Sequence, residues 1–250
     1  MGHCRDGCKL FVRAVVFIHR ISRRMGAQAM VQMILILFIC ITIPVFMSLF
    51  VLKKNSRISM LFFLIGIFVC LFAAYLDGFL ESVTELGRFH MTYTVTPVVE
   101  ELMKAFPLIL YCQLFEPNKR NLLEASIMIG IGFSVLENAY ILASNVESIT
   151  LVWALVRGIG AGMMHGICTL MIGYGLTYVR IRKKLAFTGT IGLLMLAIMY
   201  HASYNLLIQS DYRFYGIIMP LMTFIPIVFI RSRGKKRLLQ SESKGENNGN

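Results

Sequence analysis

Long apolar runs, separated by short polar segments, dominate the chain and predict its secondary structure. Runs of nearly 20 residues with almost no charge have the length at which a helix crosses the hydrocarbon core of a bilayer. Within lipid, each helix satisfies its own backbone groups. The pattern therefore predicts an all-α protein, a polytopic transmembrane helix bundle of about seven spans. These are Met30–Leu52, Ile58–Leu80, Pro97–Phe115, Ala125–Ala143, Arg157–Val179, Leu185–Leu207 and Tyr215–Ile230.

Composition agrees with a membrane protein. Hydrophobic residues make up 57% of the 250 residues and charged residues 15%, against about 25% charged in soluble domains. The net charge of +12 comes from basic residues in short loops and tails, which is typical of membrane orientation and not of nucleic-acid binding. Six cysteines form no CxxC pair, so we expect packing residues and neither a disulfide framework nor a zinc ribbon.

The chain divides into a basic N-terminal segment at 1–29, a transmembrane domain at 30–230 and a basic, polar tail at 231–250. The first, third and fifth loops and the tail are basic, so we expect this side and the C-terminus to be cytoplasmic. Residues 1–29 fall on the other side although they are basic. They could form an interfacial helix, be overridden by the later loops, or precede a translation start at Met25, Met30 or Met33. We favour the last, because Met30 opens a span directly.

Polar side chains within four spans break the apolar pattern. A charged side chain at the bilayer centre costs about 2.5–3.5 kcal/mol on insertion scales, so such residues face the bundle interior and have partners. Counting a rise of about 1.5 Å per residue from the extracytoplasmic ends places two glutamates and both histidines about 6–12 Å deep. We therefore expect one layer of ionisable groups in the outer half of the membrane. The polar residues are Glu100, Glu101, Lys104, Glu137, Asn138, His165, His201 and Asn205.

The spacing of these residues gives local expectations. Glu100 and Lys104 share a helix face at four-residue spacing, as do His201 and Asn205. Glycines at 158, 162 and 166 repeat every four residues, which would let the helix of His165 approach a neighbouring helix closely.

This set of side chains suits the activation of water. A carboxylate can take a proton from water, and histidines with a carboxylate can bind a metal ion that activates water. An asparagine can donate a hydrogen bond to an oxyanion. Each residue alone also has a structural explanation, such as a hydrogen-bonded packing histidine, an interfacial Glu100–Lys104 ion pair or a polar helix contact at Glu137. The combination is more specific than its members.

At these residues the sequence resembles the PrsW family of membrane-embedded proteases, relatives of the CAAX prenyl proteases and bacteriocin-processing proteins. The resemblance covers roughly residues 97–207. It implies a peptidase whose double glutamate and histidines form the active site, and which cuts membrane-anchored proteins such as anti-sigma factors near the outer face. It also implies one divalent metal ion, zinc being the first candidate. The matching pieces are Glu100-Glu101-x-x-Lys104, Gly132-Phe133-x-x-x-Glu137-Asn138, His165 in its glycine-rich helix and His201-x-x-x-Asn205.

One departure qualifies the resemblance. Prenyl proteases have Phe-x-x-x-His where this chain has Phe133-x-x-x-Glu137, which argues against a prenyl protease and leaves the metal ligands open.

We therefore expect an intramembrane endopeptidase with named roles. Glu101, with Glu100 as the alternate, would be the base that activates water. Glu137, His165 and His201 would bind a metal ion or the water, and Asn205 would stabilise the oxyanion. The expected partners are a membrane-anchored protein substrate and membrane lipids, with no nucleic acid and the oligomeric state open.

Two other functions use the same residues. A proton-coupled transporter or channel also needs intramembrane acids and histidines, but it predicts an inverted repeat or broken spans, and the sequence shows neither clearly. A non-enzymatic membrane scaffold would tolerate substitution of all of them together.

Overall fold

The computed structural model describes residues 36, 41, 43–45, 57–84, 86–144, 150–179 and 183–226. All regular structure in these ranges is helical, which confirms the predicted all-α class. Segments 1–29 and 231–250, and most of the predicted span Met30–Leu52, lie outside the described residues. The helices are α3 (Arg57–Val83), α4 (Arg88–Phe115), α5 (Lys119–Ser144), α6 (Leu151–Leu155), η1 (Val156–Ala161), α7 (Gly162–Val179) and α8 (Lys183–Gln209), with a further helical segment at 213–226.

Among the described residues, four helices are long and apolar enough to cross a membrane. They are Ile58–Val83, Lys119–Leu142, Leu151–Tyr178 and Thr188–Gln209, and they match the second, fourth, fifth and sixth predicted spans. The predicted total of about seven is not confirmed. The predicted span Pro97–Phe115 is helical within α4, but every membrane-length window of α4 contains Glu100, Glu101 and Lys104. The predicted span Tyr215–Ile230 is helical as far as residue 226, where the described part ends.

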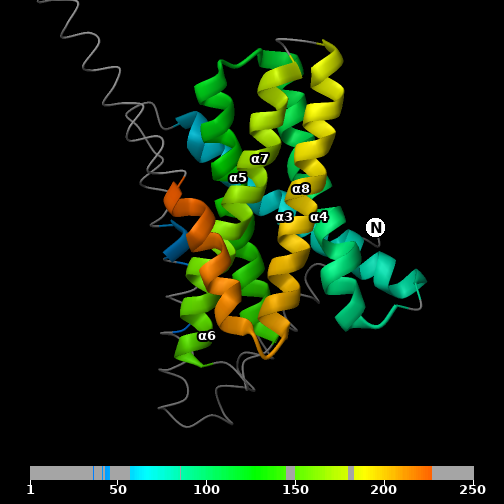
Figure 1. Ribbon diagram of the computed structural model, residues 1–250, viewed down its shortest axis with the longest axis vertical. Coiled ribbons are helices and arrows are strands. Elements are labelled where there is room, and N and C mark those ends of the chain that lie inside the picture. The colour runs from blue at the N-terminus through cyan, green and yellow to red at the C-terminus, as the bar shows by residue number, and fades with distance from the viewer. Residues whose placement is uncertain are drawn as a thin grey trace, which may run out of the picture.

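The helices pack side by side around α5 and α7. Helix α5 contacts both α3 and α7, α7 also packs against α8, and α4 contacts α3, α7 and α8 (Figure 1). The segment 213–226 lies along α8, where the Tyr200 hydroxyl donates to the carbonyl of Met219 at 3.2 Å. The end of α3 and the start of α4 stand out to one side of these helices.

Glycines bring α5 close to both neighbours. A Cβ on Gly132 would overlap the carbonyl oxygen of Phe63 on α3, and a Cβ on Gly130 would overlap the carbonyl oxygen of His165 on α7. The close contact at His165 therefore depends on Gly130, whereas Gly166 meets only a side-chain carbon of Ile131 at 4.0 Å. Small residues allow this approach between membrane helices.

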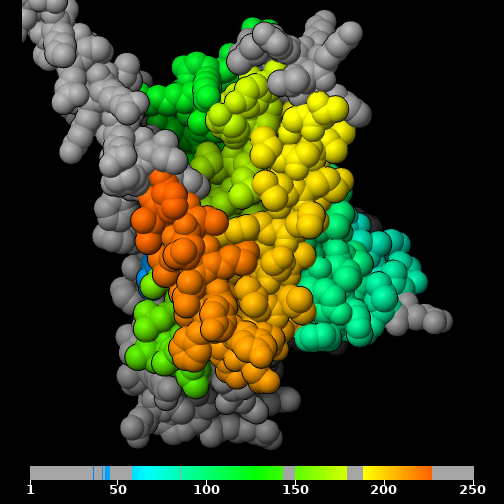
Figure 2. Space-filling view, in the orientation of Figure 1, coloured from blue at the N-terminus to red at the C-terminus, as the bar shows by residue number. Residues whose placement is uncertain are grey.

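Ionisable residues lie inside the bundle beside its apolar core, and many large apolar side chains are exposed on its surface. On α3, Phe68 and Phe72 are more than 60% exposed, whereas the side chains of the ionisable residues below are almost fully buried. Helix α8 and the segment 213–226 present much of one such outer face (Figure 2). This distribution fits a protein whose surface faces lipid. The buried polar residues include Glu100, Glu101, Lys104, Ser134, Asn138, Arg157, His165, Thr169 and His201.

A π-helical turn joins α6 to α7. Thr150 caps α6 by accepting a hydrogen bond from the backbone N–H of Trp153 at 3.2 Å, as N-cap threonines do. The helix continues through η1 into α7. The predicted start of this span at Arg157 is therefore wrong, because the charge was taken as a helix end. Arg157 lies inside the helix with 6% exposure, and an ion pair described below makes its burial tolerable.

Candidate active site

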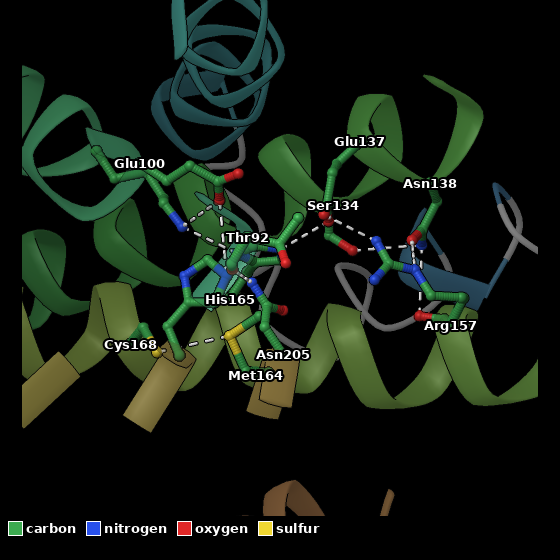
Figure 3. A network of polar contacts seen from close by, with 12 residues as sticks. Thr92, Glu100, Ser134, Glu137, Asn138, Arg157, Met164, His165, Cys168 and Asn205 are labelled. Atoms are coloured by element: carbon green, nitrogen blue, oxygen red, sulfur yellow. Dashed lines mark hydrogen bonds and ion pairs between the residues drawn. The ribbon is translucent and has the colours of Figure 1, made fainter. Parts of the chain in front are cut away.

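A continuous chain of contacts joins six ionisable side chains from five helical segments, and Figure 3 labels three of them, Arg157, Glu137 and His165. It starts at Arg157 of η1, passes to Glu137 of α5 and then to His165 of α7. From His165 it continues to Lys104 and Glu101 of α4 and ends at His201 of α8. The five closest contacts are 2.8, 2.8, 2.9, 2.7 and 2.8 Å in that order. Residues far apart in sequence thus form one buried network.

Helix α4 contributes three of the charged groups to this centre. Lys104 lies three and four residues after the two glutamates, so all three share one side of the helix. The Nζ of Lys104 is 2.7 Å from Oε1 of Glu101 and 3.8 Å from Oε2 of Glu100. Buried charges need such partners, because an unpaired one would lose its hydration without compensation. The expected Glu100–Lys104 proximity is present, with Glu101 the closer partner.

The contacts define the hydrogen-bonding state of His165. An ammonium group only donates hydrogen bonds, so Nδ1 of His165 accepts from Lys104 at 2.9 Å. The other nitrogen, Nε2, then carries the proton and donates to the Glu137 carboxylate at 2.8 Å. Glu137 therefore holds His165 in the tautomer whose Nδ1 lone pair points toward the centre.

His201 is oriented in the opposite sense. Its Nδ1 lies 2.8 Å from Oε1 of Glu101, and a carboxylate oxygen accepts, so Nδ1 carries the proton. The lone pair is left on Nε2, which is buried and has no hydrogen-bond partner among the described residues. The two histidine rings meet edge to face with centroids 4.9 Å apart. Each histidine thus has one carboxylate partner and turns its other nitrogen inward.

The double glutamate and His201 carry unpaired buried atoms. Within the described part of the chain, Oε2 of Glu100, Oε2 of Glu101 and Nε2 of His201 lack hydrogen-bond partners. The Glu100 oxygen is 3.8 Å from Nε2 of His201. This separation is close to the roughly 3.3–3.5 Å between two ligand atoms of a tetrahedral zinc ion with bonds of about 2.0–2.1 Å. A bridging atom between them would satisfy both groups.

The donor chemistry also fits a metal ion. One donor atom each from Glu100, His165 and His201 lie within 4.8 Å of one another. Two histidines and a glutamate form a known catalytic zinc set, with water as the fourth ligand. In metal sites a ligating histidine usually donates its second N–H to a carboxylate, and Glu137 and Glu101 occupy that position here. The sequence-based ligand set had Glu137 in place of Glu100, and that set stays a prediction.

Arg157 is a site residue that the sequence analysis missed. Its Nη2 lies 2.8 Å from Oε1 of Glu137, and its Nε donates to Oδ1 of Asn138 at 3.3 Å. The guanidinium thereby anchors the carboxylate that orients His165. A signal was present in the sequence, because Arg157 is followed at once by the glycine-rich run that carries His165.

Asn205 lies apart from the ionisable chain. Its side-chain nitrogen donates to the backbone carbonyl of Thr92 at 2.8 Å, which ties α8 to the first part of α4. Its spacing from His201 places both side chains toward α4, as expected, but only His201 reaches the paired glutamates. The structure therefore unites Glu100, Glu101, Glu137, His165 and His201, and it gives Asn205 a separate contact.

Comparison with known proteins identifies the family. Residues 54–230 match the family model described as PrsW family intramembrane metalloprotease. No curated protein and no solved structure shows significant similarity to the chain. Since the matched region covers most of the chain, this protein belongs to the PrsW family and is an intramembrane protease. The resemblance found on four sequence motifs is confirmed, and the family together with the buried Glu-His-His group suggests a metal ion.

Proposed function

We propose that this chain is an endopeptidase that cuts membrane-anchored proteins at the cluster formed by Glu100, His165 and His201. The observation that carries the proposal is the set of unpaired buried atoms on Glu100, Glu101 and His201. Unpaired polar atoms cost free energy in an apolar interior unless water, an ion or substrate occupies the site. Family membership favours this function over a proton-coupled transporter.

Glu101 is the proposed general base. Its Oε1 is held by Lys104 and His201, whereas its Oε2 is unpaired and can accept a proton from water. Base catalysis needs a carboxylate within hydrogen-bond distance of the water. Glu100 is the alternate base. Its Oε2 lies 3.8 Å from Nε2 of His201, and this separation suits two ligands of one metal ion better.

Glu100, His165 and His201 are the groups that would hold a metal ion. A bound zinc ion would supply a water of lowered pKa and polarise the scissile carbonyl. Around it, Glu137 and Glu101 keep the histidines in their tautomers, and Arg157 keeps Glu137 in place. The rigid arrangement favours hydrolysis because the groups need little reorganisation. Glu137 as a direct ligand remains the alternative assignment.

Asn205 remains the proposed oxyanion donor. Preorganised donors of this kind stabilise a tetrahedral intermediate. Its nitrogen is 2.8 Å from the Thr92 carbonyl, so this role requires the amide to exchange that acceptor for the substrate.

Cleavage near the outer face is proposed from the loop charges. The basic loops and tail favour a cytoplasmic C-terminus, and the depths counted for Glu101, Glu137 and His201 then favour a centre in the extracytoplasmic half. A suitable substrate is a membrane-anchored regulator such as an anti-sigma factor, cut beside its membrane anchor. Its cleavage would release a bound transcription factor on the other side.

A comparison of protein N-termini in whole cells tests the proposal. Cells would express the wild-type chain, Glu101→Ala or Glu124→Ala at equal membrane levels. Glu124 is a matched control, because it pairs with Arg120 at the far end of α5. A new N-terminus next to a membrane anchor should appear with wild type and Glu124→Ala only. Identical N-termini in all three strains under several envelope stresses would contradict the proposal and turn attention to ion flux in proteoliposomes.

A further inference from the structure

Lys104 donates a hydrogen bond to the nitrogen of His165 that would serve as a metal ligand. Of the three donor residues, Glu100 and His201 each keep an unpaired atom. The inward nitrogen of His165 does not, because Lys104 donates to it at 2.9 Å. A lone pair cannot hold a hydrogen bond and a metal bond together. Lys104 and the ion therefore depend on the same atom.

The Lys104 ammonium also has the contacts of a bound cation. It lies 2.7 Å from Oε1 of Glu101 and 3.8 Å from Oε2 of Glu100. The ring of Phe133 packs beneath it, with the nitrogen 4.2 Å from the centroid, and stabilises positive charge through its π face. An ammonium thus supplies part of the charge that a metal ion would bring.

The charge balance favours competition. With Glu100 ionised, as binding to a metal ion requires, Glu100, Glu101 and Glu137 together would carry one negative charge more than Lys104 and Arg157 offset. A divalent cation added beside Lys104 would meet a like charge in a poorly screened interior, where such repulsion is strong. Without Lys104, the excess of negative charge would be larger and a divalent ion would meet no neighbouring ammonium.

From these contacts we propose that Lys104 and a divalent metal ion compete for Nδ1 of His165, and that Lys104 thereby sets the metal affinity of the site. The inference rests on the proposed function only in using the same Glu100, His165 and His201 site. When the ion binds, the ammonium leaves Nδ1 and keeps Glu101 and Phe133. The site is thus protected against tight, permanent occupation by metal.

Zinc binding by the full-length chain in detergent tests this. Equilibrium dialysis against buffered Zn²⁺ would compare wild type with Lys104→Met and Lys104→Gln, each checked for folding by its unfolding curve. Groups that contact metal ligands typically change metal affinity by about 10–100-fold. We therefore expect both variants to bind Zn²⁺ at least about tenfold more tightly than wild type, because Nδ1 of His165 is then free of its competitor. Lys119→Met is the matched control. Lys119 is an exposed lysine at the start of α5 whose ammonium packs over the ring of Tyr174, away from the Glu100, His165 and His201 site. It should leave the affinity unchanged.

A second substitution shows where the zinc binds. Adding His201→Ala to Lys104→Met should abolish the gain. Folded Lys104→Met and Lys104→Gln proteins with wild-type Zn²⁺ affinity would overturn the inference, as would a gain that survives His201→Ala. None of these readouts needs proteolysis, so failure of the proposed function, seen as absent cleavage, is distinguishable from failure here.

A measurement on the wild-type chain applies even where the Lys104 variants do not fold. In protein labelled with ¹⁵N-histidine, Zn²⁺ should shift the Nδ1 resonance of His165, because its hydrogen bond from Lys104 is replaced. An unchanged resonance at Zn²⁺ levels that load the protein would also overturn the inference.

Discussion

Arg157 and Glu137 form a buried ion pair between η1 and α5, with Nη2 and Oε1 2.8 Å apart. The pair lies at one end of the contact chain, and the second oxygen of the same carboxylate accepts a hydrogen bond from Nε2 of His165. The position of one imidazole thus depends on an arginine that never contacts it.

Removing Arg157 should destabilise the protein by about 3–5 kcal/mol, because it leaves the Glu137 carboxylate buried without its cation. Arg157→Leu would be compared with Arg157→Leu/Glu137→Leu by reversible unfolding in mixed micelles. The double variant should be more stable than the single one, since no charge is then left unpaired. Arg88→Leu is the control. Its ion pair with Glu81 is exposed and should be worth less than about 1 kcal/mol. A double variant no more stable than Arg157→Leu would contradict this account.

Glu137→Gln and Glu101→Gln should differ in their effects on cleavage. The amide oxygen of glutamine can still accept the hydrogen bond from His165. Glu137→Gln should therefore lower the cleavage rate only about 10–100-fold, as for other groups that orient metal ligands. Glu101→Gln removes the proposed base and should lower it about 10²–10⁴-fold. Rates would be measured on an identified substrate at equal enzyme loading. A larger loss in Glu137→Gln, together with loss of bound metal, would favour Glu137 as a direct ligand.

Gly130→Ala should separate α5 from α7 at the site. The new Cβ would overlap backbone atoms of His165, and overpacking of this kind costs about 1–3 kcal/mol. Gly192→Ala provides the control, because a Cβ there meets nothing within 4 Å. It should be neutral or stabilise the helix by about 0.4–1 kcal/mol. Unfolding and cleavage measured on both variants check the prediction, which fails if the two behave alike.

Asn205→Ala should lower stability by about 1 kcal/mol, the usual value of one hydrogen bond. The bond lost is the one from its amide to the Thr92 carbonyl, which ties α8 to α4. Parallel unfolding and cleavage assays separate the two proposed uses of this amide. A cleavage rate more than about 100-fold lower at unchanged stability would assign it to the oxyanion.

The sequence predicts which residues meet but not how they pair. Lipid excludes charge, so Glu101, Glu137, His165 and His201 had to face inward, and the structure joins them in one network. Which oxygen pairs with which imidazole nitrogen depends on helix rotation by a few tens of degrees, which spacing alone does not give. Arg157 was misplaced because a charge beside an apolar run normally marks its end. Its ion-pair partner, Glu137, lies twenty positions earlier along the chain, and no local pattern reveals such a pair.

The π-helical turn Val156–Ala161 has a consequence for how this site tolerates change in length. Such a turn accommodates an additional residue in an otherwise regular helix. Deleting one residue there would restore α-helical geometry, but Arg157, which lies within the turn, would change its angle about the helix axis relative to His165 by up to about 100°. The guanidinium would then lose its contact with Glu137. The length of this turn therefore sets the angle at which Arg157 meets Glu137. Insertions or deletions in Val156–Ala161 should impair the site more than substitutions that keep its length.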